Sequence, residues 1–147
     1  MPDSPESAEP TRVVLDGSVA LAWHFEDEAD PYADDIAARV PELEFVVPAI
    51  WGVEVANAVL VGERRGRADR VQAEAWKSRV TILPLVMDIQ DPSEVLGATL
   101  ELARLHNLSA YDASYLELAI RRNLPLATLD KKLRAAAQTS GVTIFSP

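Results

Sequence analysis

The feature that most constrains the fold is the alternation of short, β-branched apolar runs with longer segments of helical period. The apolar runs are typical of buried strands, and they cover residues 11–15, 43–47, 80–84, 124–129 and 142–145. Strands that alternate with helices favour a parallel sheet, joined by right-handed crossovers and covered by helices on both faces. We therefore expect an α/β fold: a three-layer sandwich with a central, mostly parallel five-stranded sheet.

The expected helices are marked by local start and stop signals. They cover residues 19–25, 32–40, 49–65, 69–78, 92–106, 108–120 and 131–140. Ser18 is a candidate N-cap for the first helix, and Pro31 suits the first turn of the second. In the helix over 92–106, Leu96 is among the residues that we expect to face the core. Asn123 is expected to end the sixth helix.

Length and composition favour one domain. The chain has 147 residues, of which 48% are hydrophobic, so residues 11–147 can form a single core. Residues 1–10 are acidic and proline-rich, and we expect them to be a disordered tail. No apolar run approaches the roughly 20 residues needed to cross a bilayer, so no membrane association is expected. The sequence has no cysteine, which favours a cytoplasmic location.

Composition also excludes several functional classes. Without cysteine, disulfides, thiolate catalysis and cysteine-ligated zinc are not available, and two histidines give poor support to histidine-rich metal sites. The formal net charge of −9 argues against non-specific coating of nucleic acid. It is compatible with an enzyme whose metal ions supply positive charge, or with a basic partner protein.

Four carboxylates occupy positions at which a shared site would form. Asp16 and Asp130 each follow an apolar strand, whereas Glu54 and Asp112 lie near helix starts, beside the apolar stripe. Sites in open parallel α/β sheets form beyond the carboxyl ends of the strands, so these four side chains are expected to converge.

Clustered carboxylates repel one another, and a divalent cation removes that cost. Hard oxygen ligands completed by water favour Mg²⁺, with Mn²⁺ as the alternative. Such an ion can activate water for attack on a phosphodiester. Ser18 and Asn57 are candidates to orient ligands or bound water.

The same carboxylates also have ordinary structural interpretations. Asp112 stands three residues after Ser109, which is the spacing of a capping box, and Asp130 suits an N-cap. Asp16 could belong only to a strand-to-helix turn. Glu54 is harder to explain in this way, because an acid on a core-facing helix needs a partner.

Two other functional classes therefore stay open. One is a non-catalytic acidic α/β interaction module with a basic partner. The other is a phosphotransferase or phosphatase with an aspartyl nucleophile at Asp16; such enzymes usually carry a second aspartate two residues later, where this chain has Ser18.

Four motifs, taken in order, resemble those of PIN-domain nucleases, and most closely those of VapC-type toxins of bacterial toxin–antitoxin pairs. They are VVLDGSVA at 13–20, EVAN at 54–57, LSAYDASY at 108–115 and ATLDKKL at 127–133. The resemblance spans residues 13–145. Each motif is weak alone, and the combination is specific.

The resemblance implies a PIN-like fold and an endoribonuclease that depends on Mg²⁺ or Mn²⁺. It further implies RNA as the substrate, a homodimer, and a cognate antitoxin that inserts a segment toward the acidic site. A housekeeping PIN nuclease without an antitoxin is the alternative. By this resemblance the catalytic and metal-binding residues are Asp16, Glu54, Asp112 and Asp130, supported by Ser18 and Asn57.

Overall fold

The computed structural model describes residues 8–147, so seven residues of the expected N-terminal tail lie outside the described part of the chain. Four strands form one sheet in the order β3-β2-β1-β4. All three strand pairings are parallel. The strands are β1 (Thr11–Leu15), β2 (Leu43–Pro48), β3 (Leu85–Asp88) and β4 (Leu126–Ala127).

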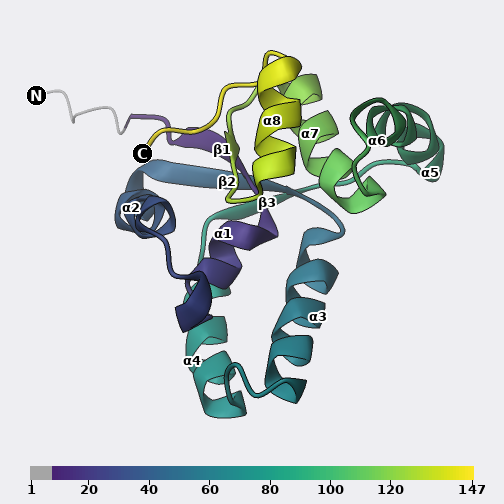
Figure 1. The fold of residues 1–147 in the computed structure, drawn as a ribbon. Coiled ribbons are helices and arrows are strands. Elements are labelled where there is room, and N and C mark those ends of the chain that lie inside the picture. Colours follow the sequence, from purple (N-terminus) through teal and green to yellow (C-terminus); the bar gives the residue numbers. More distant parts are fainter. Residues whose placement is uncertain (1–7) are drawn as a thin grey trace, which may run out of the picture.

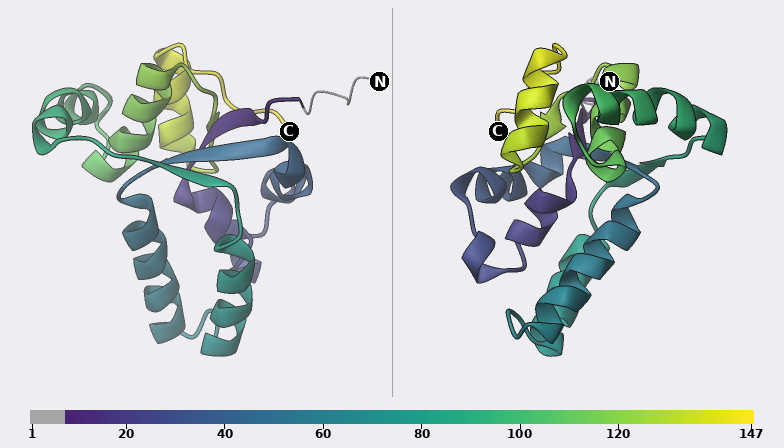
Figure 2. Two further views of the ribbon diagram at one scale, coloured as in Figure 1. Left: turned by 180° about the vertical axis from the view of Figure 1, so that it is seen from behind. Right: turned by 45° about the vertical axis from the view of Figure 1, so that its right-hand side comes forward.

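Helices cover both faces of this sheet, as expected (Figures 1 and 2). On one face lie α1 (Gly17–Ala22), α2 (Pro31–Arg39), α3 (Trp51–Arg64) and α4 (Arg70–Val80). The other face carries α7 (Ala110–Arg122) and α8 (Lys131–Thr139). Figure 1 shows α3 and α4 projecting from the sheet as a helical hairpin. The short elements η1 (Glu26–Glu28) and η2 (Val40–Glu42) flank α2.

The expected fifth strand is wrong. Residues 142–145 contribute one isolated parallel bridge, between Leu126 and Ile144. Its partner strand, β4, has only two residues. Beyond β4 the chain turns toward α8, and the Thr128 hydroxyl accepts from the N–H of Asp130 at 3.0 Å in that turn. A longer fifth strand would therefore have no neighbour with which to pair.

The third strand begins later than residues 80–84. Helix α4 continues to Val80, which joins Ala73 and Trp76 on the buried face of that helix. Ile82, inside the expected strand, is 81% exposed. Burial of Val80 on the helix therefore prevails over the β-branched pattern, and β3 starts only after Pro84.

Two helix predictions also need correction. Ser18 is not an N-cap, since α1 begins at Gly17 and Asp16 occupies the N-cap position. The segment over 92–106 divides into α5 (Pro92–Glu94), the π-helical η3 (Val95–Thr99) and α6 (Leu100–His106). Leu96 is 69% exposed rather than core-facing, because this segment projects beyond the sheet (Figure 1).

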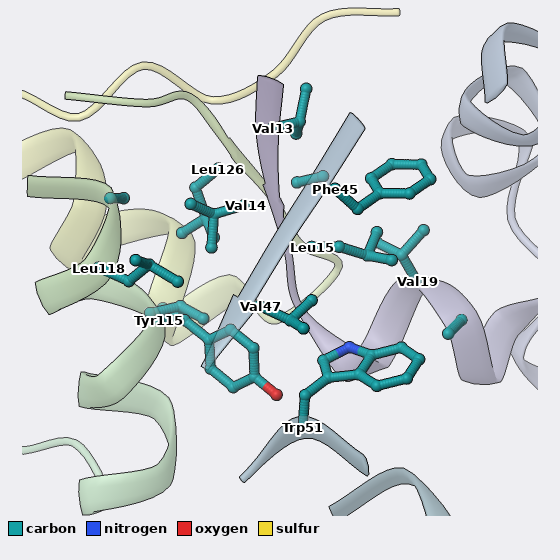
Figure 3. Packing of buried hydrophobic residues seen from close by; sticks show 14 of the residues in the cluster. Val13, Val14, Leu15, Val19, Phe45, Val47, Trp51, Tyr115, Leu118 and Leu126 are labelled. Carbon is teal, nitrogen blue, oxygen red and sulfur yellow. The ribbon is translucent and has the colours of Figure 1, made fainter. Parts of the chain in front are cut away.

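The main core lies between the sheet and the helices that pack on it, and Figure 3 shows part of it. Val14 and Leu15 of β1 and Phe45 of β2 are fully buried, as is Tyr115 of α7. Helix α7 packs across β1, β2 and β4. The first turn of α7 is thereby held at the carboxyl edge of the sheet. No helix within residues 8–147 is both long and apolar enough to span a membrane.

Candidate active site

The four predicted carboxylates line one cavity of about 620 Å³ at the carboxyl edge of the sheet. Asp16 directly follows β1, and Glu54 lies in the first turn of α3. Asp112 lies in the first turn of α7, and Asp130 precedes α8. Four separate segments thus bring acids to the same place, as expected from their positions at strand ends and helix starts.

Asp16 is the most buried of the four, with 6% of its surface exposed. Its Oδ2 accepts hydrogen bonds from the hydroxyls of Ser18, at 2.6 Å, and Thr128, at 2.7 Å. The Ser18 hydroxyl in turn accepts from the backbone N–H of Leu129 at 3.0 Å. Both hydroxyls therefore fix the carboxylate of Asp16 and join the end of β1 to the segment after β4.

Glu54 is held from the opposite side of the sheet. The Tyr115 hydroxyl donates to Glu54 Oε1 at 2.8 Å. Figure 3 shows Tyr115 reaching from α7 with its hydroxyl directed to the side where Trp51 of α3 lies. Glu54 therefore has the partner that an acid on a core-facing helix requires.

Asp112 and Asp130 show that capping and a site position are compatible. The Ser109 hydroxyl accepts from the Asp112 N–H at 3.1 Å, so Ser109 caps α7. Asp130 is the N-cap of α8, and its Oδ1 accepts from the Leu133 N–H at 2.8 Å. The ordinary interpretation of Asp130 as a cap is thus confirmed, and the same side chain still lines the cavity.

The acids raise one another's pKa values. Burial is the largest cause that raises the pKa of Asp16, Glu54 and Asp112. The negative charge of Asp112 raises the pKa of Asp16 and of Glu54 further. Asp130 has the same effect on the pKa of Asp112. Within residues 8–147, none of the four acids forms an ion pair with lysine or arginine.

The donor set fits a hard divalent cation. The convergence is nevertheless looser than expected, because no three histidine or acidic side chains in the described residues come close enough together to hold one ion jointly. An ion held by one or two carboxylates, with water completing its shell, is the usual arrangement for Mg²⁺. Asp16 is affected by the charges of both Asp112 and Asp130, and Glu54 by those of Asp16 and Asp112, so the four acids form one electrostatically coupled group.

The outer wall of the cavity carries three more acids, Asp27, Glu28 and Asp30. Arg67, in the α3–α4 turn, pairs with Asp27 at 2.9 Å and with Glu28 at 3.1 Å. The Arg67 guanidinium also lies 4.0 Å from the centre of the Phe25 ring. This basic side chain therefore holds the cavity wall together.

The two supporting residues proposed from the sequence differ in outcome. Ser18 hydrogen-bonds Asp16 inside the cavity. Asn57 is exposed and is not among the residues that line the cavity. Sequence reasoning assigned no role to Thr128, which holds Asp16, or to Tyr115, which holds Glu54. A hydroxyl two positions before Asp130 was the available signal for Thr128.

The sequence matches the PIN domain family over residues 13–138. Ribonuclease VapC3 of Pyrobaculum aerophilum is 28% identical over 122 residues, which cover 83% of this chain and 92% of that protein.

Two crystal structures resemble the fold. PAE2754 from Pyrobaculum aerophilum aligns with a TM-score of 0.65 at 21% identity, covering 88% of this chain and 86% of that one. FitAcB from Neisseria gonorrhoeae aligns with a TM-score of 0.57 at 17% identity, covering 92% of this chain and 97% of the other. Since the family match covers most of the chain and includes the four acids, the chain belongs to the PIN domain family.

Proposed function

We propose that this protein is a divalent-metal-dependent endoribonuclease that hydrolyses phosphodiester bonds of RNA. The observation that carries the proposal is the shared cavity of Asp16, Glu54, Asp112 and Asp130, in which burial and mutual repulsion raise carboxylate pKa values. The similarity to ribonuclease VapC3 supports a nuclease, and RNA as its substrate.

The cavity requires a counter-charge before a phosphodiester can enter. Seven carboxylates line it, namely Asp16, Asp27, Glu28, Asp30, Glu54, Asp112 and Asp130. Asp16, Glu54, Asp112 and Asp130 are the residues that would hold Mg²⁺ or Mn²⁺, directly or through water in the shell of the ion. When bound, such an ion supplies activation of water and stabilises the charge that develops on the phosphodiester.

The protein's own side chains keep the acids ready for this task. The hydroxyls of Ser18 and Thr128 both donate to Asp16 Oδ2, so neither of them engages Asp16 Oδ1. The α8 N-terminus fixes Asp130 through the N–H of Leu133. Preorganised ligands lose less conformational freedom when an ion binds.

The test is cleavage of RNA by Asp16→Asn and Asp112→Asn variants in buffer with Mg²⁺ or Mn²⁺. We expect each change to reduce the rate at least about 100-fold, because a ligand charge is lost at the reacting site, while circular dichroism shows a folded chain. Asn57→Ala, outside the cavity, is the matched control. Wild-type rates in both aspartate variants would refute the assignment.

RNA cleavage, a metal titration and mass spectrometry together separate the other functional classes. A non-catalytic acidic module would neither cut RNA nor bind Mn²⁺ in a calorimetric titration. An aspartyl-phosphate enzyme would give a covalent phospho-adduct on Asp16, detectable by mass spectrometry.

We further propose that the nuclease is the toxin of a type II toxin–antitoxin pair, and that it acts as a homodimer in the cytoplasm. The similarity to ribonuclease VapC3 supports this biological role. Expression should arrest growth, and co-expression of a small neighbouring reading frame should restore it. Growth arrest that no neighbouring gene relieves would favour a housekeeping nuclease. Light scattering of the purified protein tests the dimer.

A further inference from the structure

Tyr115 is the buried tyrosine whose hydroxyl meets the candidate site. It lies in α7, three residues after Asp112, and its side chain is fully buried. Its hydroxyl donates to Glu54 Oε1 at 2.8 Å and so joins α7 to α3. No other hydrogen bond to the Glu54 side chain is formed by the described residues.

We propose that Tyr115 is a positioning residue that orients the Glu54 carboxylate for a divalent cation, a role that rests on the metal-dependent function proposed above. A glutamate side chain loses rotamer freedom when it is fixed, and that loss opposes ion binding unless the side chain is already held. A charge-assisted hydrogen bond from a buried phenol fixes the carboxylate before the ion arrives. One oxygen is thereby engaged and the other is left for the ligand shell.

The surrounding packing leaves this pair little freedom. A Cβ on Gly17 would lie 3.2 Å from Val55 Cγ2 and 3.9 Å from both Glu54 Oε1 and the Tyr115 hydroxyl oxygen. The start of α1 therefore closes over the hydrogen bond. Because Asp112 precedes Tyr115 by about one turn of the same helix, any shift of α7 moves both Asp112 and the group that holds Glu54.

The ordinary alternative is that Glu54 only satisfies the buried phenol. Tyr32 offers a matched control for this alternative. Its hydroxyl donates to the backbone oxygen of Phe145 at 2.7 Å, away from the cavity. Tyr115→Phe and Tyr32→Phe each remove one hydroxyl and one hydrogen bond while they keep the ring.

The experiment measures Mn²⁺ affinity by calorimetry, and the melting temperature, for the full chain and both variants. We expect Tyr115→Phe to weaken Mn²⁺ binding about 10-fold or more, the loss that is typical when a group holding a metal ligand is removed. Tyr32→Phe should lower the melting temperature without changing Mn²⁺ affinity.

Three results would overturn the inference: unchanged Mn²⁺ affinity in Tyr115→Phe, an equal loss in Tyr32→Phe, or no Mn²⁺ binding by the wild-type chain. RNA cleavage is scored separately. If the wild type binds Mn²⁺, loses affinity in Tyr115→Phe and cuts no RNA, the proposed nuclease function fails while the role of Tyr115 stands. If it cuts RNA and Tyr115→Phe binds Mn²⁺ normally, the reverse holds.

Discussion

At the level of single residues, the four carboxylates differ in what surrounds them. Hydroxyl groups hold Asp16 and Glu54, whereas Asp130 is held by the N-terminus of its own helix. Asp112 lies in the first turn of α7, where the helix dipole favours its charged form by about 0.3–1 kcal/mol. Burial and the charge of Asp130 nevertheless prevail, since the pKa of Asp112 is raised. The charged form of Asp112 therefore lowers the stability of the folded protein.

This conflict predicts that Asp112→Asn stabilises the metal-free protein at neutral pH. Because the folded state raises the pKa of Asp112 above its ordinary value of 3.8, the folded state binds the proton more tightly than the unfolded state. Ionisation therefore costs stability; this cost grows as pH rises from about 4 through the pKa of the folded state and is constant above it. We expect the variant to melt about 3 °C higher than wild type at pH 7.

The measurement is thermal unfolding in EDTA at pH 3 and pH 7. At pH 3 both chains carry an uncharged group at position 112, so the difference in melting temperature should largely disappear. A variant that is less stable than wild type at pH 7 would contradict the prediction.

Sequence could locate the acids, the hydroxyl of Ser18 and the cap at Asp130, but not the contacts that Thr128 and Tyr115 make with Asp16 and Glu54. Strand ends and helix starts follow from chain order, which is why Asp16 and Asp130 were predictable. Thr128 and Asp16 lie 112 positions apart, so their contact depends on strand register. In α3 the buried direction is set by Trp51, Val55 and Gly62, and at about 100° per residue Asn57 points about 140° away from it.

At the level of elements, the end of α3 is shaped by close packing. Gly62 is buried, and a Cβ there would overlap the ring of Phe25. Phe25 in turn stacks against Arg67, which holds the acidic cavity wall. Gly62 therefore allows Phe25 to pack against α3, in the position where it contacts the arginine that binds the cavity wall. Sequence reasoning predicted the helix but not this contact, because glycine in a helical pattern carries no signal of what approaches it.

Gly62→Ala should destabilise the protein by about 1–3 kcal/mol, since overpacking prevails over the gain of about 1 kcal/mol in helix propensity. A Cβ on Gly52, in the same helix, would meet no heavy atom of another part of the chain within 4 Å. Gly52→Ala is the matched control and should be neutral or stabilising by up to about 1 kcal/mol.

Urea denaturation gives both free energies of unfolding. Equal effects of the two substitutions would mean that the Phe25 ring yields at no cost, which would remove the packing explanation.

At the level of the whole molecule, the chain carries an excess of acidic residues, and part of that excess lines the candidate site. The formal net charge is −9, and seven carboxylates line one cavity. Two of them, Asp27 and Glu28, are paired with Arg67. The remaining carboxylates attract cations to the cavity. In the proposed function these bound cations, rather than basic side chains, attract the phosphate groups of RNA. The same field would attract a basic segment of a partner protein.

Mg²⁺ or Mn²⁺ should therefore stabilise the fold beyond any effect of ionic strength. An ion at 100 times its dissociation constant that binds only the folded state stabilises it by about 2.7 kcal/mol, or about 8 °C in melting temperature. Sodium chloride at matched ionic strength should give a much smaller rise, because it only screens repulsion between carboxylates. EDTA should reverse the effect, and Asp16→Asn should reduce it. A rise that is the same in both salts would show that the cavity attracts cations without binding them, and the proposed metal site would then be wrong.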